Sequence, residues 1–423
     1  MTETGNDIIM DNSSPGNAPA PKSMIALAVI AAALGFFVDA YDLLLYSIVR
    51  NASLTGLGLV GPQILTTGID LLNAQLAGML IGGIIWGVLG DRLGRRSVLF
   101  GSIILYSLST LANGFVATIP QYAACRFIAG LGLAGDLGAG VTLVSELMSK
   151  ENRGYGTMIV AAVGVLGVVV ASLVAGKFPW RTAYFIGGGL GFLLLLLRLG
   201  VRESALFGSA KAADVSRGNF LALFTNAQRL RKYVCLILLA MPIWYAIGIL
   251  ITFSPELGKA LGLAVAPKAG TAVLVYYLAL SFGDMTNGFL SQKLKTRKKI
   301  IAAFMGFSVL FCGLYFWQGG ISLTVFYVIC ALIGWSSGYW AVFVTTAAEQ
   351  FGTNLRATVA ITAPNFVRGL TALLTLAFRA LMPSLGPLYS AAGIGIVIFI
   401  IAAISYTQLE DTYGKNLDYV EQI

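Results

Sequence analysis

Twelve long apolar runs constrain this chain more than any other feature. Each run is about 20 residues long, which is the length an α-helix needs to cross the hydrocarbon core of a bilayer. Hydrophobic residues make up 57% of the 423 residues and charged residues only 11%, a balance that excludes a soluble globular protein of this length. The runs lie near residues 24–48, 71–90, 97–117, 121–145, 155–175, 180–200, 233–254, 269–291, 300–318, 321–346, 358–381 and 386–407.

The chain also repeats itself. The polar turn Gly87–Arg96 reads GVLGDRLGRR, and about 201 residues later the turn that begins at Gly288 reads GFLSQKLKTRK, again between two apolar runs. A second echo places an acid seven residues before an arginine in each half: Glu146 with Arg153, and Glu349 with Arg356. Two echoes at nearly one offset indicate a duplicated half, as in many secondary transporters.

The motif Gly87-x-x-x-Asp91-Arg92-x-Gly94-Arg95-Arg96 resembles the signature loop between helices 2 and 3 of the major facilitator superfamily. The resemblance implies an all-α membrane protein with twelve transmembrane helices in two six-helix pseudo-symmetric bundles. The expected domains are a disordered cytoplasmic tail (1–22), an N-terminal bundle (23–200), a cytoplasmic linker (201–232), a C-terminal bundle (233–408) and a cytoplasmic tail (409–423).

The net charge of +9 is an orientation signal. Lys and Arg concentrate in alternate loops, so that side is expected to be cytoplasmic with both termini, in the plasma (inner) membrane. Nucleic-acid binding is not expected. The four cysteines lie in apolar runs without metal-binding spacing and the chain has no His. We therefore expect a protein that binds no metal or cofactor and is not an enzyme. Any proton that it binds is expected to be carried by a carboxylate.

The first apolar run carries Asp39, Asp42 and Tyr46 on one helix face. Acids inside a bilayer are costly unless they face a wet cavity, so a proton-coupling role is expected, and the alternative is an ion pair with Arg126 or Arg50. The phrase Asp39-Ala-Tyr-Asp42-Leu is similar to helix 1 of the phosphate, sialate or monocarboxylate, and metabolite proton-symporter branches. That resemblance implies that the mid-helix acid Asp136 is a proton carrier, and the alternative is a structural ion pair.

Arginines inside the spans predict an anion site. Arg368 lies mid-span, and a guanidinium binds a carboxylate or phosphate bidentately, so it is the expected clamp; the alternative is that it neutralises Asp284 or Asp136. The run 269–291 carries a polar stripe that lines a cavity or joins helices, and aromatic residues near Tyr339 either wall a substrate or pack. The expected substrate-binding residues are Arg368, Arg126, Asp284, Tyr277, Asn287, Tyr339 and Asn365.

Charged residues at the cytoplasmic ends of the runs fit gates that lock one side and part on switching. Glu146 and Arg153 fit charge pairs with the loop arginines Arg95 and Arg96, and the alternative is solvated loop charge. Gln292 stands where the first half has Asp91, so the second gate is expected to be weaker. The expected gating residues are Asp91, Arg95, Arg96, Glu146, Arg153, Arg297, Glu349 and Arg356.

These patterns favour a monomeric secondary transporter that carries a small organic anion, a monocarboxylate or a sugar acid, together with a proton by alternating access. The first alternative is an inorganic phosphate:proton symporter, which the absence of a lysine in the run 358–381 weakens. A neutral sugar or drug transporter ranks lower. A membrane sensor ranks last because no loop is long enough for a soluble output module.

Overall fold

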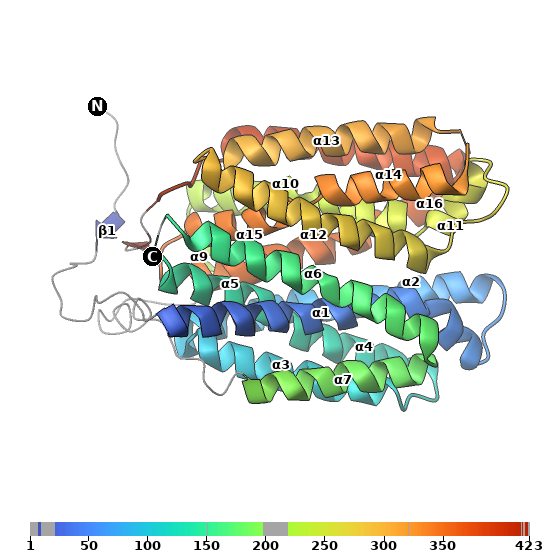
Figure 1. Ribbon diagram of the computed structural model, residues 1–423, viewed down its shortest axis with the longest axis horizontal. Helices are drawn as coiled ribbons and strands as arrows, with labels where there is room; N and C mark the ends of the chain where they lie inside the picture. Colours follow the sequence, from blue (N-terminus) through green and yellow to red (C-terminus); the bar gives the residue numbers. More distant parts are fainter. Residues whose placement is uncertain are drawn as a thin grey trace.

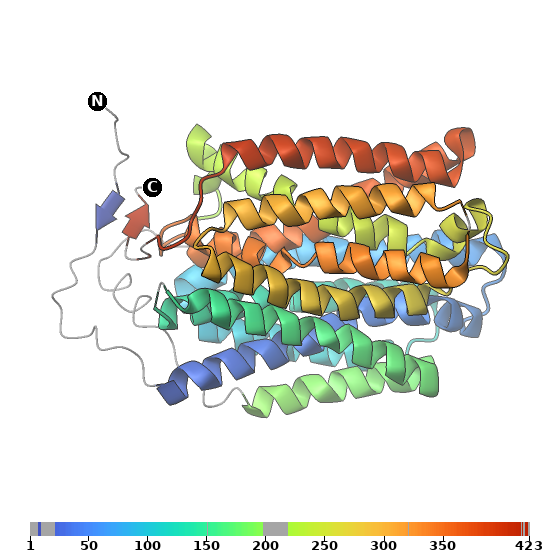
Figure 2. The same cartoon turned by 45° about the horizontal axis from the view of Figure 1, so that its top comes forward.

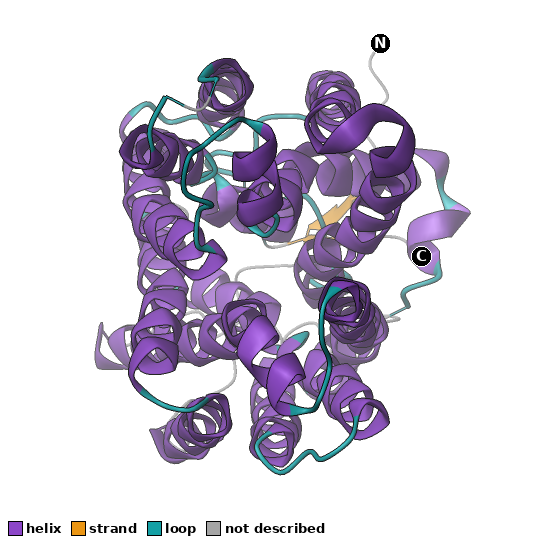
Figure 3. Cartoon of the chain, turned by 90° about the vertical axis from the view of Figure 1, so that its right-hand side faces the viewer, coloured by secondary structure: helices purple, strands orange, loops and turns teal. Residues whose placement is uncertain are grey.

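The computed structural model describes residues 7–9, 22–149, 151–197, 219–319, 321–415, 417 and 419–421. Its helices run roughly parallel to one long axis, with the N-terminal half on one side and the C-terminal half on the other (Figure 1). Figure 3 shows them end-on. The expected tail 1–22 and linker 201–232 lie mostly outside the described residues.

The first half consists of α1 (Lys22–Gly56), α2 (Pro62–Leu93), α3 (Arg95–Asn113), α4 (Ile119–Leu133), α5 (Asp136–Leu147), α6 (Arg153–Lys177) and α7 (Trp180–Leu197). α4 and α5 are two parts of one span, because the chain passes through Ala134 and Gly135 with only a local break. These elements therefore make six spans, as the hydropathy predicts.

The second half consists of α9 (Ala222–Thr225), α10 (Ala227–Tyr245), η2 (Ala246–Ile251), α11 (Ser254–Ala260), α12 (Ala269–Lys293), α13 (Lys298–Trp317), α14 (Leu323–Ser336), α15 (Trp340–Glu349) and α16 (Arg356–Gln408). Pro242 lies inside α10, and the helix changes to the π-helix η2 one turn later, in line with the disturbance that a proline causes in the helical hydrogen-bond pattern. α14 and α15 form one broken span, as α4 and α5 do.

The described residues contain nine helices that are long and apolar enough to cross a membrane. α3 and α12 are two further helices with more polar residues, and α16 contains two spans because its backbone is non-helical at Gly386, where φ is 72°. The predicted twelve-helix fold is therefore confirmed. The last span of α16 lies along the outer edge of the second half (Figure 2).

Helices of opposite halves pack directly against each other. α2 and α5 contact α16, and α6 contacts α12 and α15. Glycine permits the closest approach: a Cβ at Gly138 of α5 would lie 2.6 Å from the Cα of Ile361 in α16. Such backbone contact is how small residues join helices in a bilayer, where no hydrophobic effect drives them together.

The loops between α2 and α3 and between α12 and α13 lie at the same end of the molecule, where α1 begins and α16 ends (left in Figure 1). We call this the basic end, after the arginines and lysines in these loops. Two three-residue strands also lie there: β1 (Asp7–Ile9) pairs antiparallel with β2 (Tyr419–Glu421) (Figure 2).

Candidate functional site

A central cavity lies between the two halves. It holds about 400 Å³ of space between atoms, part of it open to solvent. Its lining residues are Phe36, Ala40, Leu43 and Leu44 of α1, Val165 of α6, Ile243 and Trp244 of α10, Ile247 of η2, Tyr276, Tyr277 and Leu280 of α12, Trp340 of α15 and Arg368 of α16. The lining is therefore apolar and rich in aromatic rings, and it contains one charged side chain.

That charged side chain, Arg368, is 4% exposed. Its guanidinium lies over two indoles, 5.8 Å from the ring centre of Trp244 and 5.5 Å from that of Trp340. Its Nη1 donates to Asn365 Oδ1 at 3.3 Å, while its Nε has no hydrogen-bond partner among the described residues. The two indoles lie next to each other, with ring centres 6.3 Å apart, so they form one aromatic surface against the guanidinium, which retains a donor for a further acceptor.

Two predicted residues support this site. Tyr277 lines the cavity, and Asn365 binds Arg368 through its oxygen while its Nδ2 donates to Ala134 O and Ile361 O, both at 2.7 Å. Asn365 thereby connects α16 to the break between α4 and α5 in the other half. Asp39, buried on α1 beside the lining residue Ala40, is close enough for its charge to attract Arg368.

Three other predicted substrate residues do not line the cavity. Tyr339 is fully buried and donates to Leu239 O at 3.3 Å. Asp284 Oδ1 accepts from the backbone N–H of Ala341 at 3.0 Å, and Asn287 is buried one turn further along α12. The polar stripe of α12 therefore divides: Tyr277 lines the cavity, Asp284 contacts the first turn of α15, and Asn287 is buried away from the cavity lining.

Arg126 and Asp42 form an ion pair inside the first half. Arg126 Nη1 lies 3.6 Å from Asp42 Oδ1, and both side chains are buried. The guanidinium lies over the rings of Tyr46 (5.6 Å) and Tyr184 (5.8 Å). The pairing left open as an alternative for Asp42 is therefore present, and neither residue lines the cavity.

Asp136 is the first residue of α5, at the break in the fourth span, and is 1% exposed. It does not line the cavity. Its expected role as a proton carrier stays a prediction, because its position fits a carboxyl at a helix N-terminus equally well.

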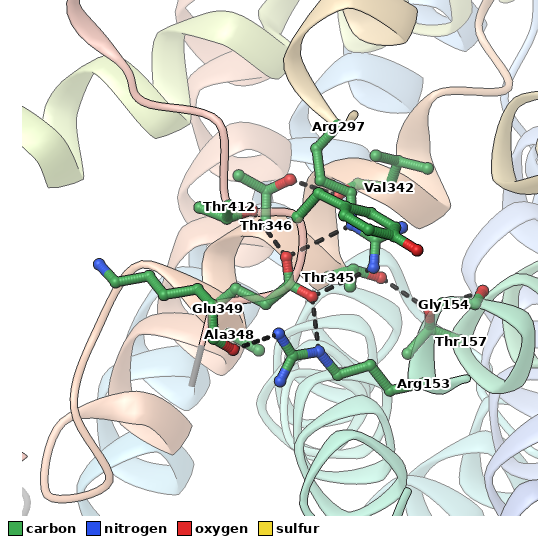
Figure 4. Close-up of polar contacts among 12 residues, drawn as sticks. Arg153, Gly154, Thr157, Arg297, Val342, Thr345, Thr346, Ala348, Glu349 and Thr412 are labelled. Atoms are coloured by element: carbon green, nitrogen blue, oxygen red, sulfur yellow. Dashed lines mark hydrogen bonds and ion pairs between the residues drawn. The ribbon is translucent and has the colours of Figure 1, made fainter. Parts of the chain in front are cut away.

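Three of the predicted gate residues, Arg153, Arg297 and Glu349, meet at the basic end (Figure 4). Glu349 Oε1 lies 2.7 Å from Arg153 Nε of the first half and 3.2 Å from Arg297 Nη2 of the second half. Its Oε2 accepts from the Thr412 hydroxyl at 2.6 Å. One buried carboxylate therefore joins both halves through charge-assisted hydrogen bonds.

The equivalent pair of the repeat also crosses between halves: Arg356 Nη1 lies 3.1 Å from Glu146 Oε1. The sequence alone suggests partners for Glu146 and Arg153 in the α2–α3 loop, and the structure adds these cross-half pairs. Arg96 lies with its guanidinium 5.5 Å from the ring centre of Phe100. The side chain of Arg95 lies outside the described residues.

Asp91, at the end of α2, caps a helix of the opposite half. Its carboxylate accepts from the backbone N–H groups of Ala357 (3.1 Å) and Thr358 (2.8 Å), in the first turn of α16. These donors have no partner within their own helix. The acid therefore satisfies them and complements the positive end of the helix dipole.

Gln292 occupies the equivalent capping position in the repeat. With its amide oxygen turned toward the backbone, it accepts from Gly154 N (2.8 Å) and Tyr155 N (3.2 Å), in the first turn of α6. The amide is neutral where Asp91 is charged. The structure thus places Gln292 at the position equivalent to Asp91, at the N-terminus of a helix of the opposite half. That the second gate is weaker stays a prediction.

The segment after α16, residues 409–415 and 417, crosses the gate, and we call it the C-terminal strap. Arg153 Nη2 donates to Lys415 O and Arg356 Nη2 to Leu417 O, each at 2.7 Å. Asp411 accepts from the Thr296 hydroxyl and from Arg297 N at 2.9 Å. The strap therefore binds gate arginines of both halves.

The sequence did not reveal this strap, because its polar residues have the composition of an ordinary tail. Trp244 was also not predicted as a site residue, and its partner Trp340 was left open between packing and substrate contact. The only available signal was that both tryptophans lie in apolar runs of the half that carries Arg368.

Comparison with protein families matches residues 23–387 to the Major Facilitator Superfamily. The niacin transporter NiaP of Acinetobacter baylyi is 27% identical over 322 residues, covering 68% of this chain and 72% of that protein. The cis,cis-muconate transport protein of the same species is 27% identical over 346 residues, covering 78% and 81%.

Among solved structures, the proton:xylose symporter XylE bound to 6-bromo-6-deoxy-D-glucose has the same fold. Its TM-score is 0.71 at 18% identity, with 94% of this chain and 98% of that chain covered. Because the family match spans most of the chain, this protein belongs to the major facilitator superfamily and is a multi-pass membrane transporter, not an enzyme.

Proposed function

We propose that this protein is a secondary active transporter for a small organic anion with a flat, apolar body and one carboxylate, taken up together with a proton. The observation that carries the proposal is Arg368, the one charged side chain in a cavity lined by aromatic and aliphatic groups. Its guanidinium would bind the carboxylate, and the indoles of Trp244 and Trp340 would pack on the apolar body.

The composition of the cavity supports this substrate over the alternatives. A sugar acid or neutral sugar would leave several hydroxyls against apolar walls, which costs free energy for each unpaired group. Inorganic phosphate would need donors around all its oxygens, and the lining offers one guanidinium and the phenols of Tyr276 and Tyr277. The relatives named for niacin and for cis,cis-muconate carry unsaturated, planar carboxylates.

A proton would enter with the anion. In the described structure the charge of Asp39 attracts Arg368. An incoming carboxylate would compete with Asp39 for the guanidinium, and protonation of Asp39 would remove that competitor. Proton and anion together keep the charge of the cavity constant, which favours their joint transfer through a low-dielectric region.

Transport would proceed by rocking of the two halves about this cavity. The closed contacts at the basic end fit a conformation that is sealed on that side. By the distribution of Lys and Arg, the basic end would face the cytoplasm, with both termini there and the protein in the inner membrane as a monomer.

The proposal is tested by uptake into proteoliposomes. A panel of labelled nicotinate, benzoate, gluconate, xylose and phosphate is offered with and without an inward proton gradient. We expect uptake of the flat monocarboxylates, increased by the gradient, and little uptake of gluconate, xylose or phosphate. Uptake led by phosphate or by a sugar would contradict the proposal.

We predict that Arg368→Ala raises the half-saturation concentration for the anion by roughly 100-fold, about 2.7 kcal/mol of binding free energy, because a charge-assisted contact is lost. Arg379→Ala is the matched control, since Arg379 lies on the same helix but is exposed. An unchanged half-saturation concentration in Arg368→Ala, with Arg379→Ala also unchanged, would remove Arg368 from the binding site.

A further inference from the structure

Asp284 belongs to α12, the eighth span, lies beside the break between α14 and α15 in the tenth span, and is fully buried. Its Oδ1 accepts from Ala341 N, one of the N–H groups in the first turn of α15 that the helix itself leaves without a partner. Its Oδ2 has no hydrogen-bond partner among the described residues, and neither has the amide of Asn287 one turn along α12. The site is therefore a carboxyl with one oxygen fixed and one oxygen available.

The surroundings of Asp284 supply no compensating cation. Among the described residues Asp284 forms no ion pair, and the Ala341 N–H is the hydrogen-bond donor that contacts its carboxyl group. The titratable side chains described on α12 and on the elements packed against it are Tyr276, Tyr277 and Lys293 of α12, Arg153, Tyr155 and Lys177 of α6, Tyr327 and Cys330 of α14, Tyr339 and Glu349 at the two ends of α15, Lys298, Lys299, Cys312 and Tyr315 of α13, Asp39, Tyr41, Asp42, Tyr46 and Arg50 of α1, and Glu256 and Lys259 of α11. A buried carboxylate without a cation is unfavourable, and binding a proton removes its charge.

α15 connects the Asp284 carboxyl to the substrate cavity and to the gate. Its first residue, Trp340, lines the cavity and faces Arg368, and its last residue, Glu349, joins the two halves at the gate. Backbone packs on backbone beside Asp284, since a Cβ at Gly338 would lie 2.1 Å from the carbonyl carbon of Gly283. A displacement at Asp284 would therefore reach α15 directly.

We propose that Asp284 is a second proton-binding site, within the C-terminal half and outside the substrate cavity, whose occupancy sets the position of α15 and so controls the gate. The bound form is the neutral acid in the closed gate described here. Loss of the proton to water leaves a carboxylate that is stable only where water reaches it, so deprotonation favours the conformation with the basic end open. The inference goes beyond the proposed anion transport and does not depend on which substrate is carried.

The test measures gate opening without substrate. Spin labels are placed at Asn152 in the first half and Lys295 in the second, both exposed at the basic end, in a full-length chain whose four native cysteines are replaced by alanine. Their distance distribution is measured between pH 5 and pH 8. One proton released on opening changes the open:closed ratio by up to about tenfold per pH unit, toward open as pH rises.

Asp284→Asn keeps an oxygen for Ala341 N and mimics the neutral acid. We expect this variant to stay closed over the whole pH range. Asp284→Glu should keep a pH-dependent open:closed ratio. Asp39→Asn should also keep the pH dependence that comes from Asp284. A full pH response in Asp284→Asn would overturn the proposal. A response to Na⁺ against choline at fixed pH, with no response to pH, would overturn it in favour of a metal cation. Failure of anion transport would leave the result standing, because no substrate is present.

Discussion

Glu349 combines burial, charge and position in a single residue. It is 0% exposed and contacts an arginine from each half. A buried ion pair returns little net stability when both partners are present, but loss of one partner leaves the other charge buried and uncompensated. We therefore expect gate closure to depend on Glu349, because closing the two halves without this carboxylate would bury Arg153 and Arg297 beside each other without a counter-charge.

At this scale we predict that Glu349→Gln shifts the open:closed ratio of the gate toward open by roughly 100-fold, corresponding to about 3 kcal/mol. The glutamine keeps the shape and some hydrogen bonds but removes the negative charge. The labels at Asn152 and Lys295 report the change. Glu410→Gln, an exposed acid of the strap, is the matched control, and equal effects of the two variants would contradict a special role for Glu349.

Among the elements, the helix N-termini at the basic end are capped from the opposite half. The end of α2 caps α16 through Asp91, and the end of α12 caps α6 through Gln292. Each cap exists only while the two halves are in contact at this end, because donor and acceptor belong to different halves. Rocking the halves apart would expose both helix ends to water at once.

The two caps differ in charge, and so should their contributions. We predict that Asp91→Ala destabilises the closed gate by about 2 kcal/mol and Gln292→Ala by about 1 kcal/mol, since hydrogen bonds to a charged acceptor are roughly twice as strong. Asp91→Asn, which loses charge but little volume, should fall between them. The same distance measurement ranks the three variants, and a larger loss for Gln292→Ala would show that charge does not decide the difference.

Over the whole molecule, hydropathy and the internal repeat predict the twelve spans and their arrangement in two halves, because each span depends on the transfer free energy of its own residues. Each of the twelve spans is visible because about 20 apolar residues report their own preference for lipid. The partner of Arg153 is not visible in this way, because Glu349 lies 196 residues later in the chain and meets it only after the halves pack. The sequence also predicts Asp284 in the substrate site, because it lies on the same stripe as Tyr277, and which part of that stripe meets the cavity is decided only when the helices pack.

The C-terminal strap belongs to this scale because it binds gate residues of both halves, and Asp411 fixes it. Burial raises the pKa of Asp411, but hydrogen bonds from the Thr296 hydroxyl and from the backbone N–H groups of Arg297, Tyr413 and Lys298 outweigh it and hold the pKa below its ordinary value. A depressed pKa contributes stability that is present above the ordinary value, about 3.9, and is lost as pH falls through the depressed one.

The strap should therefore stay bound across the whole range from pH 5 to pH 8. We predict that Asp411→Asn shifts the gate toward open by about fivefold, about 1 kcal/mol after allowance for solvent exposure, and by the same factor at both ends of this range. The labels at Asn152 and Lys295 again provide the measurement. Because Asp284 is proposed to respond within the range and Asp411 outside it, the double variant of Asp284→Asn and Asp411→Asn should lose the pH response yet keep the fivefold offset. An offset that shrinks as pH falls from 8 to 5 would instead make the strap part of the pH response and place the sensing carboxyl at the gate itself.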